Sequence, residues 1–171
     1  RLAQDAIAAL GGDGPLIGIH PGASDPARRW NVSQLAETAR LLRSAGARVV
    51  LVGGPADQEL LDELEGFSGS GVLRLRQPLP IIAFACFLAH LDRLVCMDSG
   101  PMHLCSAMGG RVVAIYGPAY PSHTSPSGDR HRIIQKICSC SERSWKTCTR
   151  SCLDAITPIE VAEAALQGLA E

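Results

Sequence analysis

The chain has 171 residues, of which 46% are hydrophobic. This length and composition fit one globular domain, large enough to bury roughly 70% of the surface of its unfolded chain. Lys and Arg together number 16 and Asp and Glu 17, which gives a net charge of -1. The overall charge therefore does not favour a nucleic acid as partner, and any anion must be bound locally.

Signals for membranes and export are absent from the sequence. No apolar run approaches the ~20 residues that cross a bilayer, and residues 1–4 (RLAQ) lack the basic-then-apolar layout of a signal peptide. These features predict a soluble, cytoplasmic protein with no transmembrane segment. Because the chain begins at Arg1 rather than Met, at the start of a predicted helix, we expect it to be part of a longer polypeptide.

Short apolar runs bounded by Gly, Pro or Asp alternate with amphipathic stretches along the chain. Runs of this kind, rich in Val, Ile and Leu, are typical of buried parallel strands. The predicted strands are 16–20, 48–52, 72–75, 94–97 and 112–116.

The amphipathic stretches predict helices before, between and after these strands. The segment 33–45 has apolar residues at helical spacing, with Ser33 as its expected N-cap and Gly46 as its terminator. The other predicted helices are 2–10, 57–64, 80–89, 101–108 and a last one, 157–169, expected to pack back on the sheet. Repeated strand–helix alternation predicts a doubly wound, Rossmann-like parallel α/β sheet in one domain over residues 1–171.

The loop after the first predicted strand, residues 20–30 (HPGASDPARRW), carries groups suited to a phosphate. Gly22 permits close backbone approach, and the Ser24 hydroxyl can hydrogen-bond a phosphate oxygen. Arg28 or Arg29 can neutralise the phosphate through paired N–H groups. The alternative is a solvated loop. Ligands bind beyond the carboxyl ends of parallel strands, so this loop and the one at residue 98 are expected to converge.

The second loop belongs to the segment 98–104 (DSGPMHL), which indicates a strand end, a tight turn and a helix start. Ser99 and Gly100 offer a hydroxyl and unhindered N–H groups at the positive end of a helix dipole. His103, four residues after Ser99, is a candidate donor to phosphate or ribose; its alternative is a buried, satisfied histidine. Asp98 would repel phosphate, so it either caps the helix or accepts a sugar hydroxyl.

Several other site types lose support. The sequence has no G-x-G-x-x-G after the first strand and no G-x-x-x-x-G-K-[ST], which disfavours the common dinucleotide and triphosphate loops. A hydrolase using Ser99, His103 and Asp98 is disfavoured, because Ser99 is not in a G-x-S-x-G elbow and neighbours on one turn rarely form a triad. A diphosphate is the ligand that remains.

Five motifs occur in order between about Ile17 and the last predicted helix: HPGAS at 20–24, RRW at 28–30, LVGG at 51–54, DSGPMHL at 98–104 and AIYGP at 114–118. This series resembles glycosyltransferase family 9, which contains the lipopolysaccharide heptosyltransferases. The resemblance implies the two-domain GT-B architecture. It also implies that this chain is the C-terminal, donor-binding half, and that the N-terminal acceptor-binding half lies outside it.

The family resemblance further implies a nucleotide-diphosphate sugar as donor, typically ADP-heptose. It implies inverting transfer to a lipopolysaccharide core acceptor, no metal in catalysis and no bound cofactor. The general base is expected in the N-terminal half, so no catalytic residue is assigned to this chain. The full-length protein is expected in the cytoplasm, with peripheral contact at the inner face of the bacterial inner membrane. The alternative is a non-catalytic nucleotide-binding or partner-docking module.

The residues matched to the donor site are Ser24, Arg28, Arg29, Asp98, Ser99, Gly100, Pro101 and His103. Arg28 stands where the family usually has a Lys, which keeps the charge and changes its geometry. Where other members present a Glu to the ribose, Asp57 or Gln58 would have to serve.

The seven cysteines divide into two groups. Cys86, Cys96 and Cys105 lie within apolar elements and are expected to be small buried hydrophobes. The others form a C-x-C-x₇-C-x₃-C cluster made of Cys138, Cys140, Cys148 and Cys152. Three states stay open for this cluster: unligated thiols, a structural zinc site, or disulfides, which a cytoplasmic setting disfavours.

Overall fold

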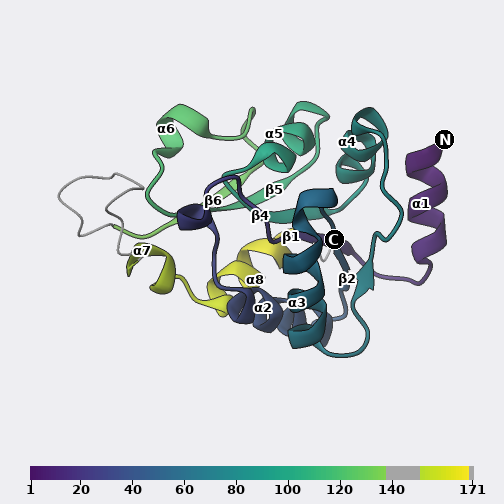
Figure 1. Cartoon of the computed structure of the whole chain (residues 1–171), viewed down its shortest axis with the longest axis horizontal. Helices are drawn as coiled ribbons and strands as arrows, with labels where there is room; N and C mark the ends of the chain where they lie inside the picture. Colours follow the sequence, from purple (N-terminus) through teal and green to yellow (C-terminus); the bar gives the residue numbers. More distant parts are fainter. Residues whose placement is uncertain (138–150, 170–171) are drawn as a thin grey trace.

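A computed structural model of the chain describes residues 1–137 and 151–169, and its centre is a six-stranded, all-parallel sheet (Figure 1). The strand order is β3-β2-β1-β4-β5-β6, as in a doubly wound fold. The strands are β1 (Leu16–His20), β2 (Arg48–Leu51), β3 (Leu73–Arg74), β4 (Arg93–Met97), β5 (Val112–Tyr116) and β6 (Arg132–Gln135). The predicted fold class is confirmed.

Helices cover both faces of the sheet (Figure 1). On one face α2 packs against α3 and α8, and on the other α4 packs against α1 and α5. The helices are α1 (Leu2–Leu10), α2 (Val32–Ser44), α3 (Gln58–Ser68), α4 (Ile81–Ala89), α5 (Gly100–Ala107), α6 (Pro121–Thr124), α7 (Ser151–Asp154) and α8 (Pro158–Leu166). In the part of the chain that the structure describes, no helix has the length and apolarity needed to span a bilayer.

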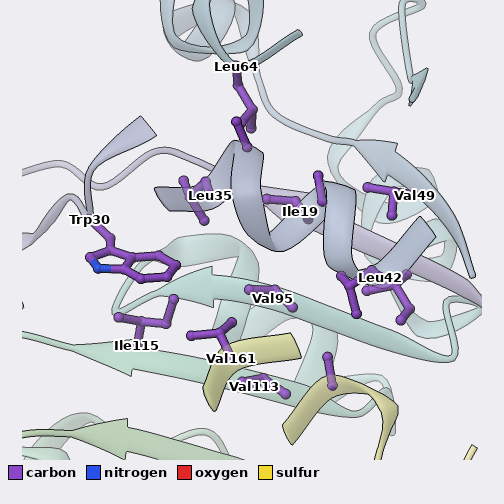
Figure 2. Packing of buried hydrophobic residues seen from close by; sticks show 14 of the residues in the cluster. Ile19, Trp30, Leu35, Leu42, Val49, Leu64, Val95, Val113, Ile115 and Val161 are labelled. Atoms are coloured by element: carbon purple, nitrogen blue, oxygen red, sulfur yellow. The ribbon is translucent and has the colours of Figure 1, made fainter. Parts of the chain in front are cut away.

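The core has two layers because successive strand residues point to opposite faces of the sheet. In β5, Val113 and Ile115 belong to the layer under α2 and α8, whereas Val112, Ala114 and Tyr116 belong to the layer under α4 and α5. Figure 2 shows the first layer, where Trp30, Ile115 and Val161 lie together. Burial on both faces explains why the strands are continuously apolar.

Most elements begin or end within a few residues of their predicted bounds, and β6, α6 and α7 have no predicted counterpart. Helix α2 is capped by Asn31, whose side chain accepts a hydrogen bond from the Ser33 N–H, so Ser33 is not the cap. Strand β6 was not predicted, because it begins with Arg132, ends with Gln135 and has two exposed residues at its start. Helix α8 packs on α2 and on the sheet, as expected for the last helix.

The cysteines of the apolar elements are mostly core residues. Cys96 and Cys105 are fully buried, and burial raises the pKa of the Cys105 thiol to about 12. Cys86 is only partly buried, although it packs against the core, so its prediction as a buried residue is not confirmed. Cys152 is buried in α7, whereas Cys138, Cys140 and Cys148 lie outside the described residues. The zinc site therefore stays a prediction.

Candidate functional site

The candidate site lies where the order of the strands reverses. From β1 the chain moves outward to β2 and β3, then returns to the other side of β1 for β4. The loops that follow β1 and β4 therefore run in opposite directions from the carboxyl ends of these strands and leave a crevice between them. Such a crevice is the usual ligand position in open α/β sheets. A pocket of about 450 Å³ occupies this crevice. The two loops predicted to converge are therefore brought together.

The polar side of the pocket is the start of α5. Ser99 is the N-cap residue, and within the described structure no side chain forms a capping hydrogen bond there. The Ser99 hydroxyl donates to the Met97 carbonyl at 3.1 Å. A Cβ added at Gly100 would meet no described atom within 4 Å. The helix end, lined by Ser99, Gly100 and Pro101, thus offers its positive dipole and open space to an anion.

A hydrogen-bonded chain of side chains connects three loops beneath this helix end. His20, the last residue of β1, places Nε2 3.3 Å from Asp57 Oδ2 and Nδ1 3.5 Å from Ser99 Oγ. Asp57 Oδ2 also accepts the Gly54 N–H at 2.8 Å. The hydrogen bond with His20 is the largest cause that lowers the pKa of Asp57 below its usual value of 3.8. The ionised carboxylate can only accept, so Nε2 carries a proton.

The hydrogen-bonded residues Asp57, His20 and Ser99 do not form a serine-hydrolase triad. In such triads the imidazole Nε2 faces the serine and Nδ1 faces the carboxylate. Here the ring has the opposite orientation, and the Ser99 proton is directed to the Met97 carbonyl. Asp98 and His103, the partners of Ser99 in the hydrolase hypothesis, do not take part in it. These hydrogen bonds instead hold the loops after β1, β2 and β4 together.

Asp57 should make the stability of the protein depend on pH. Its pKa is lower in the folded protein than in the unfolded chain, so its stabilising effect is complete above about pH 4 and is lost as pH falls through the lowered pKa. We expect the free energy of unfolding of wild type to exceed that of Asp57→Asn near neutral pH and the gap to narrow toward about pH 3. Urea unfolding at several pH values measures this gap, and a gap that is constant with pH would contradict the assignment.

Arg28 and Asp98 form an ion pair beside the pocket. Arg28 Nη1 donates to Asp98 Oδ2 at 3.1 Å, and Asp98 is only 5% exposed. The pair lines a second hollow of about 210 Å³, together with Tyr120, His123 and Thr124. Asp98 is therefore not an N-cap, since Ser99 has that position. The pair leaves Asp98 able to accept from a sugar hydroxyl while Arg28 balances its charge.

Of the other residues predicted for the donor site, some line the pocket and others do not. Ser24 and Asp57 line it, whereas Arg29, Gln58 and His103 do not. Arg29 Nε donates to the Ala23 carbonyl at 2.9 Å, which braces the loop. Gln58 donates to the Gly54 carbonyl at 3.0 Å. His103 is exposed, so its alternative as a buried histidine is wrong.

The opposite side of the pocket is an apolar wall that the sequence reasoning missed. It consists of Leu75, Pro78, Leu79, Ile81 and Phe84, from the segment after β3 and the start of α4. Ile81 is 62% exposed and lines the pocket, as apolar side chains do in most small-molecule sites. The sequence feature that could have predicted this wall is the run 79–84 (LPIIAF), which is unusually apolar for the exposed start of a helix. The pocket thus suits a ligand with one flat apolar part and one anionic part.

Comparisons with known proteins decide the family. The model of glycosyltransferase family 9 (heptosyltransferase) matches residues 1–153. The chain belongs to this family. It is 36% identical over 139 residues to lipopolysaccharide heptosyltransferase 2 of Salmonella typhimurium, which covers 75% of this chain and 38% of that protein. It is 29% identical over 158 residues to lipooligosaccharide heptosyltransferase 2 of Campylobacter jejuni, covering 88% of this chain and 50% of that protein.

Solved structures of family 9 proteins share the fold. The ADP-heptose lipopolysaccharide heptosyltransferase II of Escherichia coli superposes with a TM-score of 0.80 and 28% identity over 98% of this chain and 50% of that one. A family 9 glycosyltransferase from Veillonella parvula gives a TM-score of 0.85 and 25% identity over 95% of this chain and 48% of that one. This family 9 chain therefore spans about half the length of these relatives or less.

Proposed function

We propose that the chain is the donor-binding part of an inverting glycosyltransferase that moves heptose, or a related sugar, from an ADP-sugar to a lipopolysaccharide core acceptor. The observation that carries this proposal is the pocket at the strand-order reversal, in which the uncapped start of α5 faces an apolar wall. A nucleoside diphosphate has the two matching parts, a flat base and an anion. The names of the relatives support heptose and lipopolysaccharide as donor sugar and acceptor.

The pocket gives the donor a direction. The base packs against the apolar wall at Leu79 and Ile81, and the diphosphate lies at the N–H groups of Ser99 and Gly100. The sugar then extends toward the hollow at Arg28 and Asp98, the next cavity along the carboxyl edge of the sheet. Asp57 is the ribose candidate that lines the pocket. This direction leaves the anomeric carbon near the open edge, where an acceptor would approach.

The chemical role of these residues is to stabilise the departing diphosphate. Inverting transfer breaks the bond between the anomeric carbon and the phosphate oxygen while an acceptor hydroxyl attacks from the opposite face. Negative charge then grows on the diphosphate, where preorganised N–H groups and a helix dipole are most effective. The base that takes the acceptor proton is expected outside this chain. Donor and acceptor are supplied at the cytoplasmic face of the inner membrane in this proposal.

Gly100 provides the sharpest test of the donor position. Gly100→Ala places a methyl group in space that is free in the described structure, so the fold should be unaffected. If the diphosphate lies against this turn, the methyl group displaces it, and we expect ADP affinity to fall about tenfold or more, equal to the loss of one charge-assisted hydrogen bond. Ser99→Ala should weaken binding in the same direction. Isothermal titration calorimetry with ADP measures both.

Gly66→Ala is the matched control, because Gly66 also has no described atom near an added Cβ and lies in α3, away from the pocket. It should bind ADP as wild type does. Binding by Gly100→Ala that equals this control would overturn the donor position. Absence of ADP binding by folded wild type would overturn the function itself. ADP binding without sugar transfer by the longer protein would instead favour the non-catalytic nucleotide-binding module.

A further inference from the structure

Arginines gather at the edge of the sheet opposite the candidate site. Arg93 begins β4, Arg132 begins β6, and Arg111 directly precedes β5. With Arg130 they line a hollow of about 250 Å³. Because β4 and β5 each have five residues, this hollow lies about 16 Å along the strands from the donor pocket. It is a separate site.

Arg93 is the buried centre of this hollow. It is 5% exposed, and its Nη2 donates to the Gln167 carbonyl at 2.7 Å, at the end of α8. Its Nε is buried and has no hydrogen-bond partner among the described residues. Burial, followed by the charges of Arg111 and Arg132, lowers the pKa of Arg93. A buried donor without a partner and repelled by like charges is destabilising unless an anion compensates it.

The neighbouring groups supply only part of that compensation. The charge of Asp92 offsets some of the repulsion on Arg93, and its Oδ2 accepts the Leu16 N–H at 2.7 Å. Among the described residues that line the hollow, Asp129 is the one carboxylate, against four guanidinium groups. His131 is occupied on both ring nitrogens, by the Val112 N–H at 3.3 Å and the Ser127 carbonyl at 2.7 Å. The hollow therefore has an excess of positive charge.

The composition of the hollow also defines its ligand. Its described lining consists of charged or polar residues and Gly168, with no aliphatic or aromatic hydrocarbon side chain like those of the donor pocket's apolar wall. Several guanidinium groups around a small hollow match the oxygens of a phosphate, which they can bind in pairs. We propose that this hollow is a second anion site, which binds a phosphate group of a soluble phosphate compound or of a lipid headgroup.

The test uses the 171-residue chain and two exposed arginines, so that the fold is preserved. Arg111→Gln/Arg132→Gln removes two positive charges at the surface of the hollow and leaves Arg93 in place. The control Arg40→Gln removes an exposed arginine on α2 that pairs with Glu37 and does not line the hollow. Inorganic phosphate is titrated by calorimetry. We expect wild type and the control to bind alike and the double variant to bind at least about tenfold more weakly.

A second measurement distinguishes the two sources of phosphate. The same three proteins are mixed with phosphatidylcholine vesicles, with and without phosphatidylglycerol, and co-sedimentation is measured. Binding to the phosphatidylglycerol vesicles that the double variant loses would identify the headgroup, whereas binding of inorganic phosphate alone would identify a soluble ligand. Equal behaviour of the double variant and Arg40→Gln in both measurements would overturn the site. ADP binding at the donor pocket is unaffected by either outcome.

Discussion

Trp30→Ala is expected to lower the free energy of unfolding by about 3–5 kcal/mol, the largest effect of any single substitution considered for this chain. Trp30 is 1% exposed and packs in the layer under α2 and α8, beside Ile115 and Val161 (Figure 2). Its indole Nε1 donates to the Leu153 carbonyl at 3.1 Å. Alanine would leave a cavity and remove the indole hydrogen bond, so the Leu153 carbonyl would keep only the Ile156 N–H as a donor among the described residues. Urea unfolding followed by circular dichroism measures the loss.

Trp30→Phe separates these two contributions. Phenylalanine fills most of the space but cannot donate to Leu153, so we expect a loss of about 1–3 kcal/mol, from the lost indole hydrogen bond and a smaller cavity. A loss for Trp30→Ala below about 1 kcal/mol would show that the site relaxes around the missing ring. The result also concerns function, because Trp30 ends the loop that carries Ser24 and Arg28 and anchors that loop to the core.

The fold was largely predictable because parallel strands covered on both faces must be apolar. Strands β1 and β5 coincide with their predicted ranges, and α1 does as well. Strand β6 could not be found in this way. It lies at an edge of the sheet, so Arg132 can remain exposed and the apolar run shrinks to two residues. Its pairing with β5 supplies the evidence that its composition lacks.

The site was predictable to the level of loops and not of contacts. Sequence order places the segments after β1 and β4 at one edge of a parallel sheet, whatever the details of the turns. The partners within those loops are set by tertiary packing: His20 meets Asp57, 37 positions later, and Arg28 meets Asp98, 70 positions later. No local spacing rule reaches so far. For the same reason the role of Asp98 as an ion-pair partner was missed and a helix cap was considered.

The glycine at position 22 shows how tightly these long-range contacts are built, and Gly22→Ala is expected to disrupt them. A Cβ at this position would lie 2.1 Å from Asp57 Oδ1 and 3.0 Å from His20 Cε1. The carboxylate must therefore move away from His20 and the Gly54 N–H. We expect a loss of about 2–3 kcal/mol in the free energy of unfolding, equal to one charge-assisted hydrogen bond, and at least about a tenfold loss of ADP affinity.

A double-mutant cycle identifies the clash as the cause. Asp57→Ala removes the carboxylate that the new methyl group would strike, so adding Gly22→Ala to that background should cost less than about 1 kcal/mol. The coupling between positions 22 and 57 would then be at least about 1 kcal/mol, measured by urea unfolding of all four proteins. Additive losses would instead mean that the methyl group acts through its other close contact, the His20 Cε1 atom at 3.0 Å. Strong coupling with retained ADP affinity in Gly22→Ala would separate the two roles: the His20–Asp57 contact would stabilise the loops, and the α5 helix end would hold the nucleotide without it.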